Sequence, residues 1–466
     1  MKKIIILLLI AALTFTFCEA AFAASDFSFD SMTSKDWAGL AKQLMRKVKS
    51  SSDSDEEGSS LFGKGGVDIN KIIQIVNTIR ENGGSFDGLI GDESAQTGVA
   101  QSAAVSAINS ATFKLYAELA KSGGNLFFSP YSISTAMAMV YAGARGATAA
   151  EIQQLFGFNA QIHTSMSSLM SQLDSISVDI AQLHTANALW PAADKNILSD
   201  YRNRVARDYK AEITTLDFAN TEQARGVINK WVAGKTQGKI QNIVGPGAIS
   251  KTTPLCVTNA VYFKADWQSK FEKQATSKAV FFAKNGVTVK TDFMNQTGAF
   301  DYLQSGDVEI LELPYKAERL SMYILLPASG KFDLVEKSLT PEQLDSFIAQ
   351  AAKTKLCVSV PKFKLEESYN LNDTFKKLGM TSAFTSDANF SGMDGLLDIS
   401  IGTVLHRAFL DVNETGTEAA AATFVGMKAM ATAEKPKEFK ADRPFIFVIR
   451  DNTTGANLFI GRYMKP

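Results

Sequence analysis

The sequence predicts a mixed α+β fold in which helices dominate the first part of the main body and strands the second part. From residue 107 to about residue 250, the pattern is mostly helical. Beyond that point, strand-like runs become frequent, at residues 255–264, 279–282, 309–313, 320–326, 356–363, 444–450 and 457–463. Since strands and helices do not alternate regularly and no internal repeat is present, the pattern argues against a doubly wound parallel sheet.

Composition excludes several classes of protein. The chain has 466 residues, 45% of them hydrophobic, which suffices for one large domain or for two or three ordinary ones. The 48 Lys and Arg balance 48 Asp and Glu, so we expect no nucleic-acid partner held by net charge. Three Cys and three His argue against a disulfide scaffold and against a Cys/His metal cage, so we expect no metal site and no cofactor.

The first 23 residues have the pattern of a signal peptide. Lys2 and Lys3 precede an apolar run over residues 4–17, and a small-x-small cleavage site ends at Ala23. The run is too short for a comfortable membrane span, and no later segment reaches that length. We therefore predict a secreted or extracellular protein, periplasmic if the source is a Gram-negative bacterium, with an uncleaved N-terminal anchor as the alternative. Cleavage would leave a net charge of −1, from 46 basic and 47 acidic residues.

Cleavage would also leave only two cysteines, Cys256 and Cys357. Both lie in apolar, strand-like runs, which favours two buried free thiols over a single disulfide. The sequence alone leaves their pairing open.

Residues 24–104 differ in texture from the main body, which covers residues 105–466. Two amphipathic helical patterns, over residues 37–48 and 69–79, are separated by a Ser- and Asp-rich stretch typical of a flexible linker. A second loose stretch, residues 82–101, is rich in Gly, Ser and Asp. We predict an N-terminal extension with two amphipathic helices tethered to one large domain.

The sequence contains no complete match to the catalytic motifs considered. Residues 58–65 nearly form a phosphate-binding loop, but Gly65 replaces the required Ser or Thr and no strand precedes it. HExxH, CxxC and GxSxG are absent from the sequence. His163 and His184 lie among polar helical residues and are expected to be solvated, while His406 precedes an apolar run and is expected to be a buried, hydrogen-bonded structural residue. We predict that the protein is not an enzyme.

The most informative segment covers residues 414–423. By local propensity it is a helix, because Glu418 is followed by four alanines. At a period of two residues, one face carries only small side chains, namely Thr417, Ala419, Ala421 and Thr423. Such a strand could enter a narrow gap between existing strands without overpacking it, while Glu418 on the other face stays in water. The composition permits both structures.

The sequence around this segment resembles the serpin family. The matching segments follow in order, namely residues 125–134, 143–148, 259–267, 360–364, 378–380, 383–384, 414–423, 439–447 and 458–462. They begin with Asn-Leu-Phe-Phe-Ser-Pro-Tyr-Ser-Ile-Ser and end with Leu-Phe-Ile-Gly-Arg. The resemblance extends from about Val105 to Pro466 and so covers the whole main body.

This resemblance implies a fold and a function. The fold has three β-sheets, eight or nine helices and an exposed reactive-centre loop. The function is suicide-type inhibition, in which a serine protease cleaves the loop, is held as an acyl-enzyme and is displaced as the cleaved loop inserts into the main sheet. A non-inhibitory serpin that acts as a binding or interaction protein is the alternative.

The resemblance also assigns residue roles. The hinge comprises Glu414, Gly416, Thr417, Glu418, Ala419, Ala420, Ala421, Ala422 and Thr423. A polar cluster called the shutter comprises Ser129, Ser132, Asn259 and His406. The breach, where insertion begins, comprises Trp267, Lys362 and Glu414, and Lys362 and Glu414 are expected to form an ion pair.

The resemblance also implies a reactive bond and a protease partner. The usual spacing places the bond between Met430 and Ala431, which suits a chymotrypsin- or elastase-like protease. The bond between Lys428 and Ala429 is the alternative and suits a trypsin-like protease, and a cysteine protease stays open as a target. Residues 148–161 contain no Lys or Arg, so no heparin-type cofactor is expected through the corresponding helix, and we expect a monomer.

Overall fold

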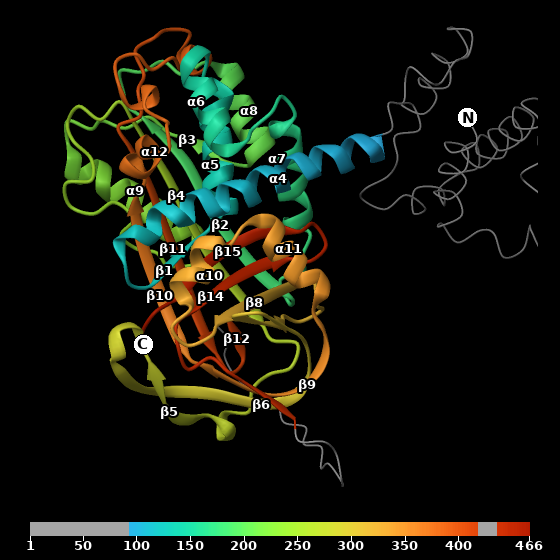
Figure 1. Ribbon diagram of the computed structural model, residues 1–466. Helices are drawn as coiled ribbons and strands as arrows, with labels where there is room; N and C mark the ends of the chain where they lie inside the picture. The colour runs from blue at the N-terminus through green and yellow to red at the C-terminus, as the bar shows by residue number, and fades with distance from the viewer. Residues whose placement is uncertain (1–92, 418–435) are drawn as a thin grey trace, which may run out of the picture. The chain divides into compact units, whose positions relative to one another are not determined.

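The computed structural model describes residues 93–417 and 436–466, and the α+β class predicted from the sequence is confirmed there (Figure 1). These residues form ten α-helices and two β-sheets. The helices are α4 (Glu93–Leu119), α5 (Pro130–Gly143), α6 (Gly146–Phe156), α7 (Ile162–Asp174), α8 (Ser199–Tyr209), α9 (Thr221–Lys235), α10 (Phe332–Ser338), α11 (Pro341–Gln350), α12 (Asn372–Lys377) and α13 (Ser391–Asp394).

The smaller sheet has six strands in the order β10-β11-β12-β4-β2-β3. Its strands are β2 (Ala181–Pro191), β3 (Glu212–Ile213), β4 (Leu255–Asp266), β10 (Phe363–Asn370), β11 (Thr403–Asn413) and β12 (Gly416–Thr417). The pairing of β4 with β11 is parallel, whereas β2 pairs with β4 and β10 pairs with β11 in antiparallel fashion. The long strands β4 and β11 therefore form the centre of this sheet.

The larger sheet has nine strands in the order β1-β15-β14-β8-β7-β6-β9-β13, with β5 paired to β6 off this path. Its strands are β1 (Leu126–Phe128), β5 (Ser277–Phe282), β6 (Thr288–Ser305), β7 (Val308–Pro314), β8 (Leu320–Pro327), β9 (Ala352–Pro361), β13 (Lys437–Lys440), β14 (Phe445–Asp451) and β15 (Ala456–Tyr463). The resemblance implied three sheets, but hydrogen bonding among the described residues traces two, because the long β6 pairs with β5, β7 and β9 in turn.

Helix α5 lies between the two sheets and is almost entirely buried. The helix begins as its sequence dictates, because the Ser129 side chain accepts a hydrogen bond from the Ser132 backbone N–H and Pro130 occupies the first turn. Phe263 of β4 and Phe459 of β15 meet with ring centroids 5.5 Å apart, which joins the two sheets in one core. The six-stranded sheet is thus buried on this face.

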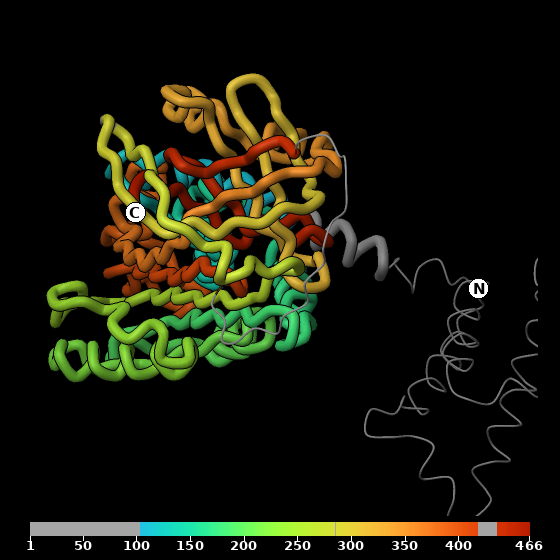
Figure 2. Tube along the Cα trace, turned by 90° about the horizontal axis from the view of Figure 1, so that it is seen from below, coloured from blue at the N-terminus to red at the C-terminus, as the bar shows by residue number. Residues whose placement is uncertain are grey.

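The opposite face of the six-stranded sheet carries a second apolar core, formed with α9. Ile228 and Val232 of this helix cluster with Trp190 of β2, Tyr262 of β4 and Phe409 of β11. The central strands are therefore covered on both faces. Figure 2 shows from below that the green helical segments gather along one side and that the yellow and orange strands cross the rest of the view.

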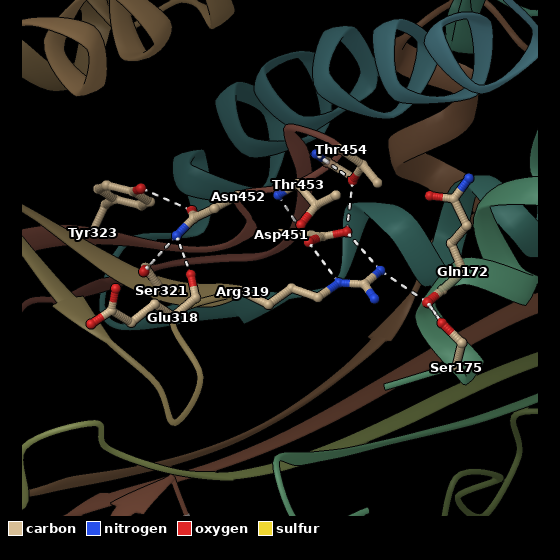
Figure 3. Close-up of polar contacts among 11 residues, drawn as sticks. Gln172, Ser175, Glu318, Arg319, Ser321, Tyr323, Asp451, Asn452, Thr453 and Thr454 are labelled. Atoms are coloured by element: carbon tan, nitrogen blue, oxygen red, sulfur yellow. Dashed lines mark hydrogen bonds and ion pairs between the residues drawn. The ribbon is translucent and has the colours of Figure 1, made fainter. Parts of the chain in front are cut away.

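A polar cluster fixes the turn that joins β14 to β15 (Figure 3). The buried carboxylate of Asp451 accepts hydrogen bonds from Arg319 Nε at 3.2 Å, from Thr454 Oγ1 at 2.9 Å and from the Thr453 backbone N–H at 3.2 Å. The same guanidinium donates to the carbonyl oxygen of Gln172 in α7 at 2.9 Å. This pairing attaches the β14–β15 hairpin to α7 without leaving the buried charge unpaired.

Several local predictions were wrong. The strand β2 lies in the region predicted to be helical, so His184 is a half-buried strand residue. His163 is also half buried, in α7, where its Nδ1 lies 2.5 Å from the Tyr209 hydroxyl. The loose stretch predicted over residues 82–101 is helical from Glu93 onward. Local periodicity failed at β2 because its pattern is set by burial against both neighbouring layers.

The strand-like runs predicted after residue 250 all correspond to strands, although the run 356–363 is divided between β9 and β10 at Lys362. Both thiols are free, as predicted, but only Cys256 is buried, while Cys357 is half buried. None of the helices in residues 93–417 and 436–466 is both long enough and apolar enough to cross a membrane.

Candidate functional site

The short strand β12 separates β4 from β11 at one end of the six-stranded sheet. Gly416 lies opposite Asp266 of β4 and opposite Asn413 of β11, and both pairings are antiparallel. Further along the sheet, β4 and β11 pair directly with each other over the seven residues of β11 from Thr403 to Phe409. The relative position of β4 and β11 is the same where they flank β12 and where they pair directly. We call the directly paired part the closed seam, and the slot that holds β12 is in line with it.

Glycine is required at position 416 by close packing. A Cβ atom on Gly416 would lie 2.1 Å from the carbonyl oxygen of Ala265 and 2.6 Å from Cα of Asp266. Both are backbone atoms of β4 and cannot move aside cheaply. The close approach of β4 therefore leaves no room for a side chain at position 416.

Thr417 is fully buried in the slot, as the period-two interpretation predicted for its side chain. Its Oγ1 lies 2.7 Å from the hydroxyl of Tyr315. The Tyr315 ring stacks on Trp267 with centroids 4.5 Å apart, and Trp267 Nε1 donates to the Asn413 carbonyl oxygen at 2.9 Å. These contacts hold the first inward-facing residue of the segment in place.

The predicted ion pair between Lys362 and Glu414 is present, with Nζ and Oε1 3.0 Å apart. Thr276 Oγ1 donates to the same carboxylate oxygen at 2.8 Å. Burial alone would raise the pKa of Glu414, but hydrogen bonds from its own backbone, Lys362 and Thr276 outweigh burial and lower the pKa. Glu414 is therefore held in its charged form beside the slot.

A row of polar side chains crosses the closed seam. The register aligns four residues on adjacent strands, namely Tyr369 of β10, His406 of β11, Asn259 of β4 and Asn187 of β2. His406 Nδ1 lies 2.5 Å from Asn259 Oδ1, and Asn259 Nδ2 donates to Asn187 Oδ1. The Tyr369 ring stacks on His406 at an interplanar angle of 12°.

Helix α5 supplies the rest of this network. The Ser129 backbone N–H donates to His406 Nε2 at 3.2 Å, so Nδ1 carries the imidazole proton and donates to Asn259. Asn259 Nδ2 also donates to the Ser132 carbonyl oxygen at 2.9 Å, and Ser129 Oγ donates to the Leu458 carbonyl oxygen at 2.6 Å. Complete burial lowers the pKa of His406 to about 3, so the cluster is neutral.

The structure thus brings together Ser129, Ser132, Asn259 and His406 in one cluster, and Trp267, Lys362, Glu414, Gly416 and Thr417 in another. The remaining predicted site residues lie outside the described part of the chain, namely Glu418, Ala419, Ala420, Ala421, Ala422, Thr423, Lys428, Ala429, Met430 and Ala431.

Sequence reasoning missed three residues of these clusters. Asn187 was missed because β2 was predicted to be helical. Tyr315 and Thr276 lie at strand ends and carry no pattern of their own. Only the register of β2 on β4 could have indicated Asn187, because it places Asn187 opposite Asn259. In residues 93–417 and 436–466, no group of three or more His, Cys, Asp or Glu side chains could hold a metal ion.

The arrangement therefore combines a partly entered slot, a closed seam in the same register and a neutral polar network beneath the seam. A protein-family model described as serpin (serine protease inhibitor) matches residues 106–466. The chain belongs to the serpin family. The fold implied by the sequence resemblance is confirmed by this match and by the solved structures that the chain resembles.

Serpins of diverse origin are similar to the chain. An uncharacterized serpin-like protein from Thermococcus kodakarensis is 43% identical over 368 residues, covering 78% of this chain and 85% of that protein. Human leukocyte elastase inhibitor is 40% identical over 356 residues, covering 74% of this chain and 93% of that protein. Among solved structures, human thyroxine-binding globulin with bound thyroxine matches with a TM-score of 0.73 at 27% identity, over 78% of this chain and 99% of that one.

Proposed function

We propose that this serpin is an inhibitor that traps a serine protease by inserting its cleaved loop between β4 and β11. The observation that carries the proposal is the slot. Gly416 and Thr417 already pair with both strands, and the seam below them continues in the same register. Residues 418–423 continue with small side chains on the inward positions, so the segment after Thr417 suits the same environment.

Insertion would release free energy through backbone pairing. The single parallel pairing of β4 with β11 would be replaced by two antiparallel pairings, one on each side of the new strand. Two pairings contain more backbone hydrogen bonds than one, and antiparallel pairing is somewhat more stable per residue. From Glu414 to Met430 the chain would extend about 50 Å at ~3.3 Å per residue. An acyl-linked protease would be displaced over that distance before its ester is hydrolysed.

The polar row beneath the seam must rearrange as β4 and β11 part. Asn259 and His406 lie on opposite sides of the seam and bond to each other. Ser129, which caps α5, and Ser132 in its first turn offer further partners on the inner face. We assign to this cluster the role of exchanging partners during opening, so that no buried group is left unsatisfied.

We assign the reactive bond to Met430–Ala431, with Lys428–Ala429 as the alternative. Met430 before the bond favours an elastase- or chymotrypsin-like target, and the similarity to leukocyte elastase inhibitor supports that class. We further propose that the protein is exported, because residues 1–23 have the pattern of a cleavable signal peptide.

The test is to mix the full-length chain with elastase, chymotrypsin and trypsin in turn. We expect a covalent, detergent-stable complex with elastase or chymotrypsin and cleavage after Met430. Cleavage after Lys428 in a trypsin complex would reassign the bond and keep the mechanism. Clean turnover of the loop by every protease, without a complex, would refute inhibition.

The alternative is a serpin that binds a partner or small molecule without trapping proteases. The similarity to thyroxine-binding globulin supports this alternative. The two functions differ in the effect of loop cleavage. An inserting serpin becomes markedly more stable to heat once its loop is cut, whereas a non-inserting one keeps its midpoint of thermal unfolding. Calorimetry of the intact and the cleaved chain therefore separates them.

A further inference from the structure

Two segments from opposite sides of the closed seam meet at the seam end that lies farthest from β12. Residues 192–198 follow β2, which pairs with β4, whereas residues 395–402 lead directly into β11. Lys195 Nζ lies 3.0 Å from Asp398 Oδ2, so an ion pair connects the two segments. The β4 side of the seam is therefore joined to the β11 side at this end by a contact between charged side chains.

Asp394, the last residue of α13, has a buried oxygen without a hydrogen-bond donor. The residue is 5% exposed, and its Oδ1 accepts a hydrogen bond from the Leu396 backbone N–H at 2.7 Å. Among the residues that the structure describes, none donates a hydrogen bond to its Oδ2. A buried carboxylate oxygen without a partner is costly, and native structures contain few of them. The environment of this oxygen therefore requires a physical explanation.

The neighbour of the Asp394 side chain is a second carboxyl group, that of Asp398. The two side chains lie within hydrogen-bonding contact of each other. Ionised carboxylates only accept hydrogen bonds, so this contact is favourable only when one of the two groups carries a proton. A proton on Oδ2 of Asp394 is donated to Asp398 and gives the buried oxygen the partner that it otherwise lacks.

The charged groups around the pair place the proton on Asp394. Burial raises the pKa of Asp394, and the contact with Asp398 raises it further. The hydrogen bond from Asp394 lowers the pKa of Asp398, and Lys195 lowers it further. Lys195 also lies 3.4 Å from the exposed Asp194. Arg145 packs against α13 but donates to two backbone carbonyl oxygens of its own segment.

We propose that Lys195, Asp394 and Asp398 form a proton-dependent clamp, which holds the far end of the seam closed while the two carboxyl groups share one proton. We call these three residues the carboxyl clamp. When Asp394 releases the proton to solvent, two like charges face each other on the segment that carries Asp398. Their repulsion displaces this segment from its place beside Lys195, and the two sides of the seam lose their connection there.

The clamp would make the opening of the seam depend on pH. Insertion between β4 and β11 requires these strands to part, so a loosened clamp lowers the free energy needed to open the seam. This consequence for trapping rests on the proposed function. The shared proton and its effect on the uncleaved seam rest on the contacts of the clamp alone, and they are measured without a protease.

The test compares amide hydrogen exchange at residues 403–405 of β11 in the uncleaved wild type and in Asp394→Asn. Asparagine keeps the shape of the side chain and a donor toward Asp398, but it cannot lose that donor. At about pH 8, we expect exchange to be about fivefold slower in the variant, which corresponds to one retained hydrogen bond. At about pH 4, near the value for an unfolded aspartate, the two chains should exchange equally. Asp333→Asn is the matched control, because it removes a carboxylate that pairs with Lys284 on other elements, and it should match wild type throughout.

The pH dependence of stability gives a second measurement. The folded-state pKa of Asp394 is raised above the value of ~3.9 for an unfolded aspartate. Its contribution is therefore complete below about pH 4 and is lost as the pH rises through the folded-state value. In urea unfolding, the stability of wild type relative to Asp394→Asn should fall as the pH rises. Asp398→Asn removes the neighbouring charge and should reduce this fall.

Equal exchange of wild type and Asp394→Asn at about pH 8 would overturn the inference, and so would a stability difference that does not change with pH. Should Asp394→Asn fail to fold, the exposed Asp398→Asn decides the question through its pH dependence of stability, and a fall as steep as that of wild type would overturn the inference. If wild type forms no covalent complex with any protease, the proposed function is refuted, whereas the exchange result still decides whether the clamp exists.

Discussion

The two polar clusters along β4 and β11 differ in charge and in access to water. At the closed seam, His406 and Asn259 are fully buried and bond to each other as neutral groups. At the open end, Lys362 and Glu414 form an ion pair, and the lysine side chain is 37% exposed. A dry, neutral cluster therefore lies where the two strands touch, and a partly exposed, charged one lies next to the place where β12 separates them.

This difference matches what each place must do if the seam opens. Parting a buried ion pair would leave charges without partners in a low-dielectric interior, which is strongly unfavourable. Neutral hydrogen bonds can be exchanged among several donors and acceptors at a smaller cost. At the open end, water already reaches Lys362, so an ion pair there neither obstructs opening nor requires a dry surrounding. The comparison predicts a ranking of effects.

The largest effect is expected from Thr417→Arg, which places a charge on the inward face of the hinge. Thr417 is already fully buried beside Tyr315 before cleavage, so a guanidinium there would destabilise β12 in its slot by several kcal/mol and block the start of insertion. We expect the stoichiometry of inhibition to rise at least about tenfold, with cleaved serpin replacing the covalent complex. Glu418→Arg is the matched control, because alternation puts position 418 on the outward face. Retained inhibition in Thr417→Arg would show that the hinge register is wrong.

The placement of Thr417 shows which parts of the site could be predicted from the sequence. Period-two alternation of small residues identified its inward face, and every strand run predicted after residue 250 corresponds to a strand. The runs did not include the long strands β6 and β11, however. The seam cluster was predictable only through the family resemblance, since residues 129, 259 and 406 meet by topology and share no local pattern. Asn187 was not predicted, because a strand covered on both faces shows no alternation of apolar and polar residues. Tyr315 escaped because its partner Thr417 lies on a distant segment.

The next largest effect is expected from Asn259→Ala. This change leaves the Nδ1–H of His406 and the Oδ1 of Asn187 without a partner in a buried site. We expect a loss of about 2–4 kcal/mol in the free energy of unfolding. Urea unfolding of the uncleaved protein measures it. An effect no larger than that of Lys362→Met would contradict the contrast between the two clusters.

The pH dependence of stability should report His406. Its pKa is lowered by burial to about 3, below the value of ~6.5 for an unfolded histidine. The unfolded chain therefore binds the proton first, so the contribution of neutral His406 is complete above about pH 6.5 and is lost as the pH falls toward 3. The expected slope is at most about 1.4 kcal/mol per pH unit for this residue.

Burial also lowers the pKa of His163, to about 4, and that of His184. The slope of wild type must therefore be compared with that of His406→Gln, which retains the other two histidines. Between pH 6.5 and 5, the wild type should lose more stability than His406→Gln. Parallel curves would mean that His406 becomes protonated without cost, and hence that the seam is open to water.

The smallest effect is expected from Lys362→Met, which keeps the apolar stem and removes the charge. Because Lys362 is partly exposed and Glu414 keeps its hydrogen bond from Thr276, we expect a loss of about 0.5–1 kcal/mol at pH 7. The folded-state pKa of Glu414 is lowered, so its contribution is present above about pH 4.5 and is lost as the pH falls through the folded-state value. The difference between wild type and Lys362→Met should therefore shrink in acid, where the His406 contribution is still being lost. If the stability difference between wild type and Lys362→Met is unchanged at pH 3, it comes from the packing of the lysine stem and not from its charge. The open end would then be stabilised without charge, as the closed seam is.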